Sequence, residues 1–188
     1  LLESPDVSIS KLTSVIKAPD FPTAGQIISS KKDIEALYTV GRGSFKVRGE
    51  WTTEDLPRGK KAIIIKSIPY GVNKSSLVEK FADLISLRKV PQLVDVRDES
   101  TEEVRIVLEL ATGADAEVAV AFLLKHTPLE SNFAVNFTVL TPTGENGALR
   151  PETISLKQAL QHFLDFRIQV VEKRLLFERK CLLERLHI

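Results

Sequence analysis

The sequence contains few residues of the kinds that perform covalent or metal chemistry. Its 188 residues include one cysteine, three histidines, two tyrosines, one tryptophan and no methionine. The single Cys181 excludes an internal disulfide framework and a metal site built from several cysteines, and it fits a reducing compartment. No apolar run approaches the roughly 20 residues that a membrane-spanning helix requires. We therefore expect no membrane span.

Net charge is almost absent as well. The chain has 26 lysines and arginines against 25 acids, a formal net charge of +1. Overall charge thus gives no argument for a nucleic-acid partner, and only the local distribution of charge can do so. Apolar residues make up 43% of the chain, which is enough for a sizeable core. The chain begins and ends inside regular patterns, so we expect a piece of a longer protein.

The middle of the chain predicts alternating strands and helices. Apolar runs predict strands at 62–68, 93–97, 104–110 and 133–140. Helices are expected from Asn73 or Ser75 to Leu87, with Ser76 and Glu79 as a capping-box pair, and from Asp115 to Lys125. The order β-α-β-β-α-β is typical of a two-layer, ferredoxin-like α+β sandwich, an antiparallel sheet with two helices on one face.

The flanking segments predict shorter elements and one long helix. Short N-terminal helices are expected at 9–16 and at 33–39, the second capped by Asp33, and a half-buried strand at 45–51. A loop rich in proline and glycine at 141–151 precedes a capping box formed by Ser155 and Gln158. Helical periodicity then continues to the end. We predict an N-terminal connecting segment (1–32), an α+β domain (33–150) and a long C-terminal helix (151–188).

No catalytic or metal-binding residue is predicted. His126, His162 and His187 lack metal-ligand spacing, and Cys181 suits a small buried position. Tyr38 and Tyr70 are expected to be packing residues. The acidic cluster could bind Mg²⁺ or perform acid–base chemistry, but it has no nearby base, which favours a solvated hairpin tip. Its members are Asp95, Asp98, Glu99, Glu102 and Glu103.

The charge is distributed unevenly along the chain. Residues 42–74 contain eight lysines and arginines against three acids, a net +5, and residues 95–117 carry a net −6. A basic, glycine-rich segment before a strand that presents lysine and arginine outward suits the phosphates of a nucleic acid. An ordinary solvated surface explains the same pattern equally well. The candidate DNA-binding residues are Arg42, Lys46, Arg48 and Lys74.

Several short blocks of sequence occur in order along the chain. They are Pro19–Thr23, Gly41–Ser44 with Arg48, Ile68–Tyr70 with Val72–Lys74, Arg97–Ser100, Phe133 with Val135 and Asn136, and Arg185–Ile188. Together these blocks resemble the A subunit of bacterial type IIA DNA topoisomerases, which include topoisomerase IV and gyrase. The family usually has a second glycine where Ala24 stands, and commonly an acid in place of Ser67.

The resemblance implies the tower domain of these enzymes, together with the start of the helix that leads to the C-terminal dimer gate. It implies double-stranded DNA as a ligand, an A-subunit homodimer, and a B subunit that supplies Mg²⁺ and ATP hydrolysis in an A2B2 heterotetramer. The implied location is the bacterial cytoplasm, on the chromosome. The motif with the nucleophilic tyrosine is absent, so we expect no cofactor and no cleavage activity in this chain alone. The alternative is a stand-alone ferredoxin-like domain that associates with proteins and has no DNA role.

Overall fold

The computed structural model of the chain describes residues 1–143 and 148–186. The chain forms two compact units. Unit 1 comprises Leu1–Lys17, Lys31–Gly43 and Val135–Ile188, and unit 2 comprises Ala18–Ser30 and Ser44–Ala134. Part of the predicted loop, 144–147, and the C-terminal His187 and Ile188 lie outside the described residues.

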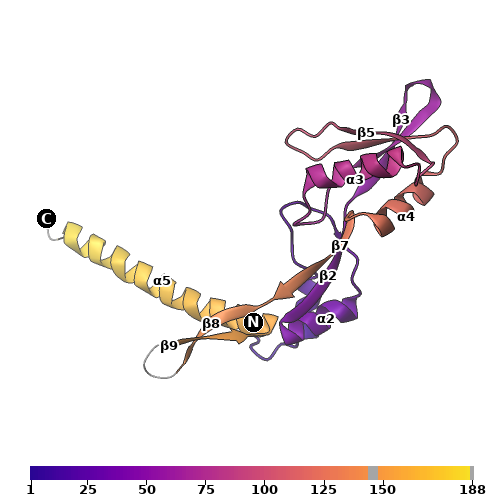
Figure 1. Ribbon diagram of the computed structural model, residues 1–188. Coiled ribbons are helices and arrows are strands. Elements are labelled where there is room, and N and C mark those ends of the chain that lie inside the picture. Colours follow the sequence, from indigo (N-terminus) through magenta and orange to yellow (C-terminus); the bar gives the residue numbers. More distant parts are fainter. Residues whose placement is uncertain (144–147, 187–188) are drawn as a thin grey trace. The chain divides into compact units, whose positions relative to one another are not determined.

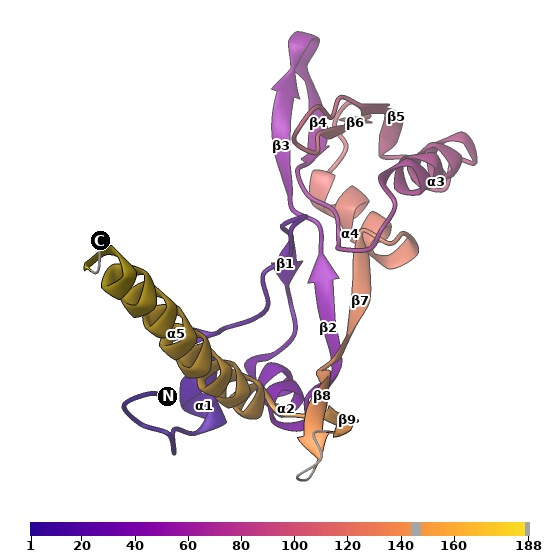
Figure 2. The same cartoon turned by 90° about the vertical axis from the view of Figure 1, so that its left-hand side faces the viewer.

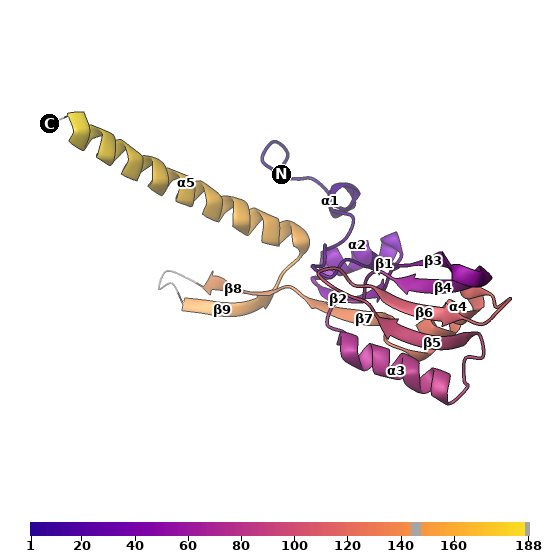
Figure 3. The same cartoon turned by 90° about the horizontal axis from the view of Figure 1, so that it is seen from above.

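Unit 2 contains a four-stranded antiparallel sheet, and two helices lie on one side of it (Figure 1). The strand order is β3 (Trp51–Leu56), β4 (Lys60–Ile65), β6 (Ile106–Leu110) and β5 (Leu93–Asp98). The helices are α3 (Lys74–Ser86) and α4 (Ala116–His126). Figure 3 shows α3 lying along the sheet beside β5, with which it is in contact.

The core of unit 2 lies between this sheet and its helices. Alternate side chains of β4 and β6 face the helices because successive residues of a strand point to opposite faces. Each fully buried aliphatic or aromatic side chain contributes about 1.5–3 kcal/mol. Those less than 2% exposed include Ile63, Ile65, Ile106, Leu108, Leu77, Phe81 and Leu123. A smaller buried cluster, made of Ala62, Ile64 and Val107, occupies the opposite face of the sheet.

The α+β class, the β-α-β-β-α-β order and the long C-terminal helix are confirmed. One strand departs from the ferredoxin-like arrangement. The last strand of the series, β7 (Glu130–Asn136), pairs outside the four-stranded sheet, and β3 occupies the edge next to β4 instead. Strands β3 and β4 are joined by the three-residue turn Pro57–Gly59, so their pairing closes a very short loop. This local hairpin takes the edge that a distant strand would otherwise fill.

Strand β7 belongs to a three-stranded sheet, in which β2 (Arg42–Arg48) lies between β1 (Gln26–Ile27) and β7 (Figure 2). The strand predicted at 45–51 is wrong in its extent, because β2 ends at Arg48 and β3 begins at Trp51. The strand predicted at 133–140 is likewise two strands. Strand β7 ends at Asn136 and β8 begins at Thr138.

Unit 1 contains three helices and a hairpin. The helices are α1 (Ile9–Val15), α2 (Lys31–Val40) and α5 (Leu156–Leu186). Strand β8 (Thr138–Thr143) pairs with β9 (Ala148–Thr153), so the predicted loop at 141–151 is wrong for most of its length. Both strands of a two-stranded sheet are edges, and edges tolerate prolines such as Pro142 and Pro151.

The caps Asn73, Asp115 and the Ser155–Gln158 pair are confirmed, whereas the predicted Ser76–Glu79 capping box is wrong because Ser76 lies inside α3. The side chain of Asn73 accepts a hydrogen bond from the amide of Ser76, and that of Asp115 accepts one from Glu117. The hydroxyl of Ser155 accepts from the amide of Gln158 at 3.2 Å, and the Gln158 side chain accepts from the amide of Ser155 at 2.9 Å. Asp33 is not a cap, because α2 already begins at Lys31 and places Asp33 in its first turn.

Helix α5 contacts α1 and α2 within unit 1, yet none of its described residues is buried. Many of its apolar side chains are exposed, among them Phe163, Phe166, Leu176 and Phe177, each more than 50% accessible. Among the described residues, no helix is both long and apolar enough to span a membrane.

Candidate nucleic-acid interface

Strand β2 carries two of the four candidate residues on its outward face. Phe45 and Val47 are 1% and 0% exposed, whereas Lys46 between them is exposed and Arg48 is half-buried. The predicted alternation of basic and apolar side chains is therefore present in this strand. The backbone of Lys46 is fixed on the β1 side, since its amide donates to the hydroxyl of Ser29 at 2.8 Å and its carbonyl accepts from Ile28 at 2.9 Å.

The carboxylate of Glu130, on β7, lies between these two cations. Its Oε2 accepts hydrogen bonds from Nε and Nη2 of Arg48 at 2.9 and 2.6 Å, and its Oε1 lies 3.4 Å from Nζ of Lys46. Burial alone would raise the pKa of Glu130, but the Arg48 and Lys46 contacts outweigh it and the net pKa is lowered. Glu130 is therefore ionised at neutral pH. No pattern in the sequence singled it out.

The other two candidates, Arg42 and Lys74, are not part of the cluster around Glu130. Arg42 is the first residue of β2 and is exposed, but it belongs to unit 1. Lys74 is the first residue of α3, and its Nζ lies 2.8 Å from Oδ2 of Asp98 at the end of β5. Hydrogen bonds from Lys74 and Ser100 lower the pKa of Asp98 to about 2. The structure thus brings Lys46 and Arg48 together and places Lys74 at the start of α3, next to the end of β5.

A polar cleft of about 400 Å³ borders Arg48 where β2 ends. Two hydrogen bonds fix the backbone around Glu50 to the segment that follows β4. The amide of Glu50 donates to the Ser67 hydroxyl at 2.8 Å, and the amide of Lys66 donates to the Glu50 carbonyl at 2.8 Å. Two cationic side chains, Arg48 and Lys66, reach this cleft. Its lining consists of Gln26, Arg48, Gly49, Glu50, Trp51, Thr52 and Lys66.

The acidic segment is not separate from the basic one in space. Strand order places the acidic strands β5 and β6 beside β4, and Lys60 of β4 forms an ion pair with Glu109 of β6. Arg105 donates to both oxygens of Glu54 at 3.0 and 2.7 Å, which raises the pKa of Arg105 and lowers that of Glu54. Basic and acidic segments that are separate in sequence are therefore adjacent in unit 2.

All five members of the predicted acidic hairpin tip are exposed, as expected, and several of them form ion pairs. Arg97 pairs with Asp95, Glu99 and Glu109, and Asp98 pairs with Lys74. Glu102 and Glu103 remain exposed. The described part of the chain has no group of three or more histidine, cysteine, aspartate or glutamate side chains placed to hold a metal ion.

The two tyrosines pack, as expected, in different ways. Tyr38 is 2% exposed and stacks on Phe137, with ring centroids 6.3 Å apart, and burial raises its pKa. Tyr70 is 42% exposed and forms an aromatic trio with Phe21 and Phe133, with centroid distances of 4.9–5.6 Å. Phe21, Tyr70 and Phe133 belong to three different blocks of the family resemblance, so the packing of their rings brings these blocks together.

Among the described residues, the remaining candidates lie in no arrangement suited to catalysis or metal binding. His126 ends α4 and stacks on Phe122, with ring centroids 4.2 Å apart. His162 and Cys181 lie on α5, and Cys181 is half-buried, so the prediction of a buried position is wrong. His187 lies outside the described residues. Ala24 adopts a φ of 56°, a conformation that favours glycine, so its side chain is accommodated with backbone strain.

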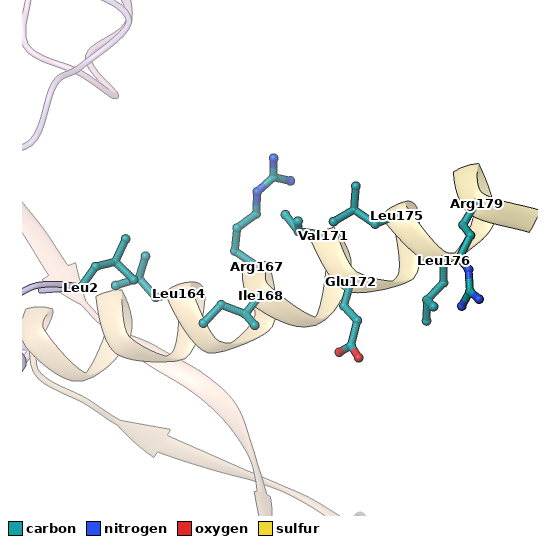
Figure 4. A pocket seen from close by; sticks show the side chains of 9 residues that line it. All are labelled: Leu2, Leu164, Arg167, Ile168, Val171, Glu172, Leu175, Leu176 and Arg179. Atoms are coloured by element: carbon teal, nitrogen blue, oxygen red, sulfur yellow. The ribbon is translucent and has the colours of Figure 1, made fainter. Parts of the chain in front are cut away.

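An apolar groove lies on α5 (Figure 4). Aliphatic side chains make up its floor, with Leu2 beside Leu164, and Arg167, Glu172 and Arg179 project at its margin. No pair of groups suited to acid–base or nucleophilic chemistry lines it. The aliphatic lining residues are Leu2, Leu164, Ile168, Val171, Leu175 and Leu176.

Comparison with known proteins identifies the family. The family model for the DNA gyrase/topoisomerase IV A subunit matches residues 1–188. The chain belongs to this family. It is 41% identical to the A subunit of DNA gyrase from Lawsonia intracellularis and to the A subunit of DNA topoisomerase 4 from Caulobacter vibrioides, each over 189 residues and all of this chain. It is 38% identical over 191 residues to the A subunit of a probable chloroplastic/mitochondrial DNA gyrase from Oryza sativa subsp. japonica.

The match covers a region of these relatives. The chain spans 22%, 24% and 20% of the length of the three relatives, respectively. Membership of the gyrase/topoisomerase IV family is thus assigned from the whole of this chain. The aromatic trio and the Lys46–Glu130–Arg48 cluster are features of this region.

Proposed function

We propose that this chain is the DNA-contacting tower portion of the breakage–reunion subunit of an ATP-dependent type II DNA topoisomerase. In this proposal it holds an arm of the bent gate duplex and links the cleavage centre to the exit gate. The observation that carries the proposal is the outward face of β2, where Lys46 and Arg48 lie on the side opposite to the buried Phe45 and Val47. Family membership over the whole chain supports it.

The chemistry of this face suits the sugar–phosphate backbone. Lysine and arginine on a strand fixed by hydrogen bonds can contact phosphates, and such contacts carry no base sequence information. Bending a site of about 20–30 base pairs costs roughly 1–6 kcal/mol, and phosphate contacts on the flanking arms can offset that cost. The proposed role of this chain is therefore electrostatic and mechanical.

The test is duplex binding by the Lys46→Glu, Arg48→Glu double variant. Each lost phosphate contact is expected to lower the slope of log affinity against log salt by about 0.9, so the variant binds more weakly and with a flatter slope. The matched control reverses two exposed charges elsewhere, Glu102→Lys and Glu103→Lys, and is expected to leave binding unchanged or stronger. Fluorescence anisotropy on a duplex of about 30 base pairs, from about 50 to 200 mM salt, measures both. Wild-type affinity in the basic-face variant would refute the proposal.

Helix α5 supplies the second part of the proposal. It exposes aromatic and aliphatic side chains, which suits association with other protein elements on the way to the exit gate. We assign to the whole enzyme an A-subunit homodimer, a B subunit that binds Mg²⁺ and hydrolyses ATP, an A2B2 assembly, and a bacterial cytoplasmic location on the chromosome. The exposed apolar α5 also suits the stand-alone association domain, which predicts no duplex binding at all.

A further inference from the structure

Glu130 lies where a phosphate group would lie if Lys46 and Arg48 contacted DNA. Each of its two carboxylate oxygens faces one cation, Oε2 the guanidinium of Arg48 and Oε1 the ammonium of Lys46. A backbone phosphodiester also presents two non-bridging oxygens, and arginine and lysine are its usual partners. The carboxylate is therefore an internal substitute for the expected ligand.

We propose that Glu130 is an internal competitor of DNA: it occupies Lys46 and Arg48 in the unbound chain and gives them up when a backbone phosphate binds. The inference rests on the proposed function of this face. Its consequence is that the surface binds duplex more weakly than its two cations would alone. The free-energy barrier to sliding or release of the duplex is then low, because the Glu130 carboxylate replaces the departing phosphate beside the two cations.

The burial of the three side chains fits an exchange of this kind. The Glu130 side chain is 18% exposed, whereas those of Arg48 and Lys46 are 35% and 51% exposed. The cations are therefore open to solvent while the carboxylate is held beneath them. Arg48 also lines the polar cleft that Lys66 reaches, and Glu130 is not among the residues that line it, so the cleft offers an incoming phosphate a route to Arg48.

The attachment of the two strands limits the change to side chains. Gly49, next to Arg48, donates its amide hydrogen to the carbonyl of Leu129, next to Glu130, at 2.9 Å. Lys46 is fixed by Ser29 on its other side. With the backbone held at both places, exchange of one anion for another needs only rotation of long, flexible side chains.

The variant Glu130→Gln tests this inference, because it keeps the shape and an acceptor oxygen for Arg48 but removes the charge. We expect duplex affinity to rise about three- to five-fold, the range for loss of a competing ion pair near a surface. The matched control is Glu99→Gln. Glu99 also accepts from two arginines, Arg97 and Arg105, and its variant loses the same charge. Glu99 directly follows β5 of the four-stranded sheet, and its variant is expected to change affinity less than about two-fold.

A double-mutant cycle separates competition from a general charge effect. In the background Lys46→Gln, Arg48→Gln the gain from Glu130→Gln is expected to vanish, since no cation is left to release. A gain that persists there overturns the inference. So does a Glu130→Gln variant that binds no better than the wild-type chain, which would make the carboxylate a structural support for Arg48.

The same cycle distinguishes this inference from the proposed function. If the Lys46→Gln, Arg48→Gln variant itself binds duplex like the wild-type chain, the basic face is not the DNA contact. If that variant loses affinity and Glu130→Gln gains none, only the competitor role fails. Circular dichroism checks the fold of each variant. Glu130→Thr, an uncharged residue that favours strands, serves as a second variant should the glutamine variant unfold.

Discussion

Gly41 offers a sharp test of why the Gly41–Ser44 block has its sequence. The residue follows α2, its φ is +75°, its amide donates to Leu37 at 2.7 Å and its carbonyl accepts from Phe137 at 2.8 Å. A Cβ at this position would lie 1.9 Å from the carbonyl oxygen of Ile154 and 2.8 Å from its carbon. These are backbone atoms of Ile154, which is only 3% exposed. Rotation of a side chain therefore cannot relieve the contact.

The cost of Gly41→Ala has two parts. A left-handed conformation costs a residue with a Cβ about 1–2 kcal/mol. Displacing the Ile154 backbone adds about 1–3 kcal/mol of overpacking, and it strains the hydrogen bond of 3.1 Å from the Ile154 amide to the Phe137 carbonyl. The expected loss in the free energy of unfolding is about 2–5 kcal/mol.

Gly113→Ala is the matched control, because Gly113 has a φ of +76° and a Cβ added there would have no described atom within 4 Å. It is expected to lose only the conformational part, about 1–2 kcal/mol. Urea unfolding followed by circular dichroism measures the loss of stability in both variants. Because two compact units need not unfold together, limited proteolysis locates which unit is destabilised. Equal losses in the two variants would refute the steric argument. The glycines of the Gly41–Ser44 block would then be explained by the alternative from the sequence, a basic, glycine-rich segment that suits phosphates.

Local patterns predicted most elements of the fold but not which strands pair. The alternation of Phe45, Lys46 and Val47 and the capping residues Asn73 and Asp115 depend on neighbours in sequence, and the structure agrees with them. Strand β7 was expected in the larger sheet, but the edge beside β4 belongs to β3, whose three-residue connection favours that pairing. Periodicity carries no information about this choice.

The electrostatics of the site depended on the same non-local pairing. Arg48 and Glu130 are 82 residues apart in sequence, and Arg105 and Glu54 are 51 apart. Counting charges along the chain separated a basic segment from an acidic one, whereas the strand order places them side by side. The direction of Lys46 followed from strand alternation. Its partner did not, because nothing near Glu130 in sequence marks it as an ion-pair partner of β2.

Two further predictions concern Tyr38 and Asp98. The chain alone is expected to form no covalent DNA adduct, because burial raises the pKa of Tyr38 and Tyr70 packs against Phe21. Covalent adducts on supercoiled plasmid, trapped with denaturant, would contradict this. Asp98→Asn is expected to lower the free energy of unfolding near pH 7 by about 1 kcal/mol, after allowance for solvent screening of the partly exposed Lys74 pair. The pKa of Asp98 is depressed to about 2, so its contribution is present above the unfolded pKa and is lost as pH falls toward the folded value. Urea unfolding of the wild-type chain and the variant should therefore converge between about pH 5 and pH 2. A stability difference that stays constant across this range would mean that the Asp98 charge contributes nothing, and that the variant acts through the Ser100 hydrogen bonds alone.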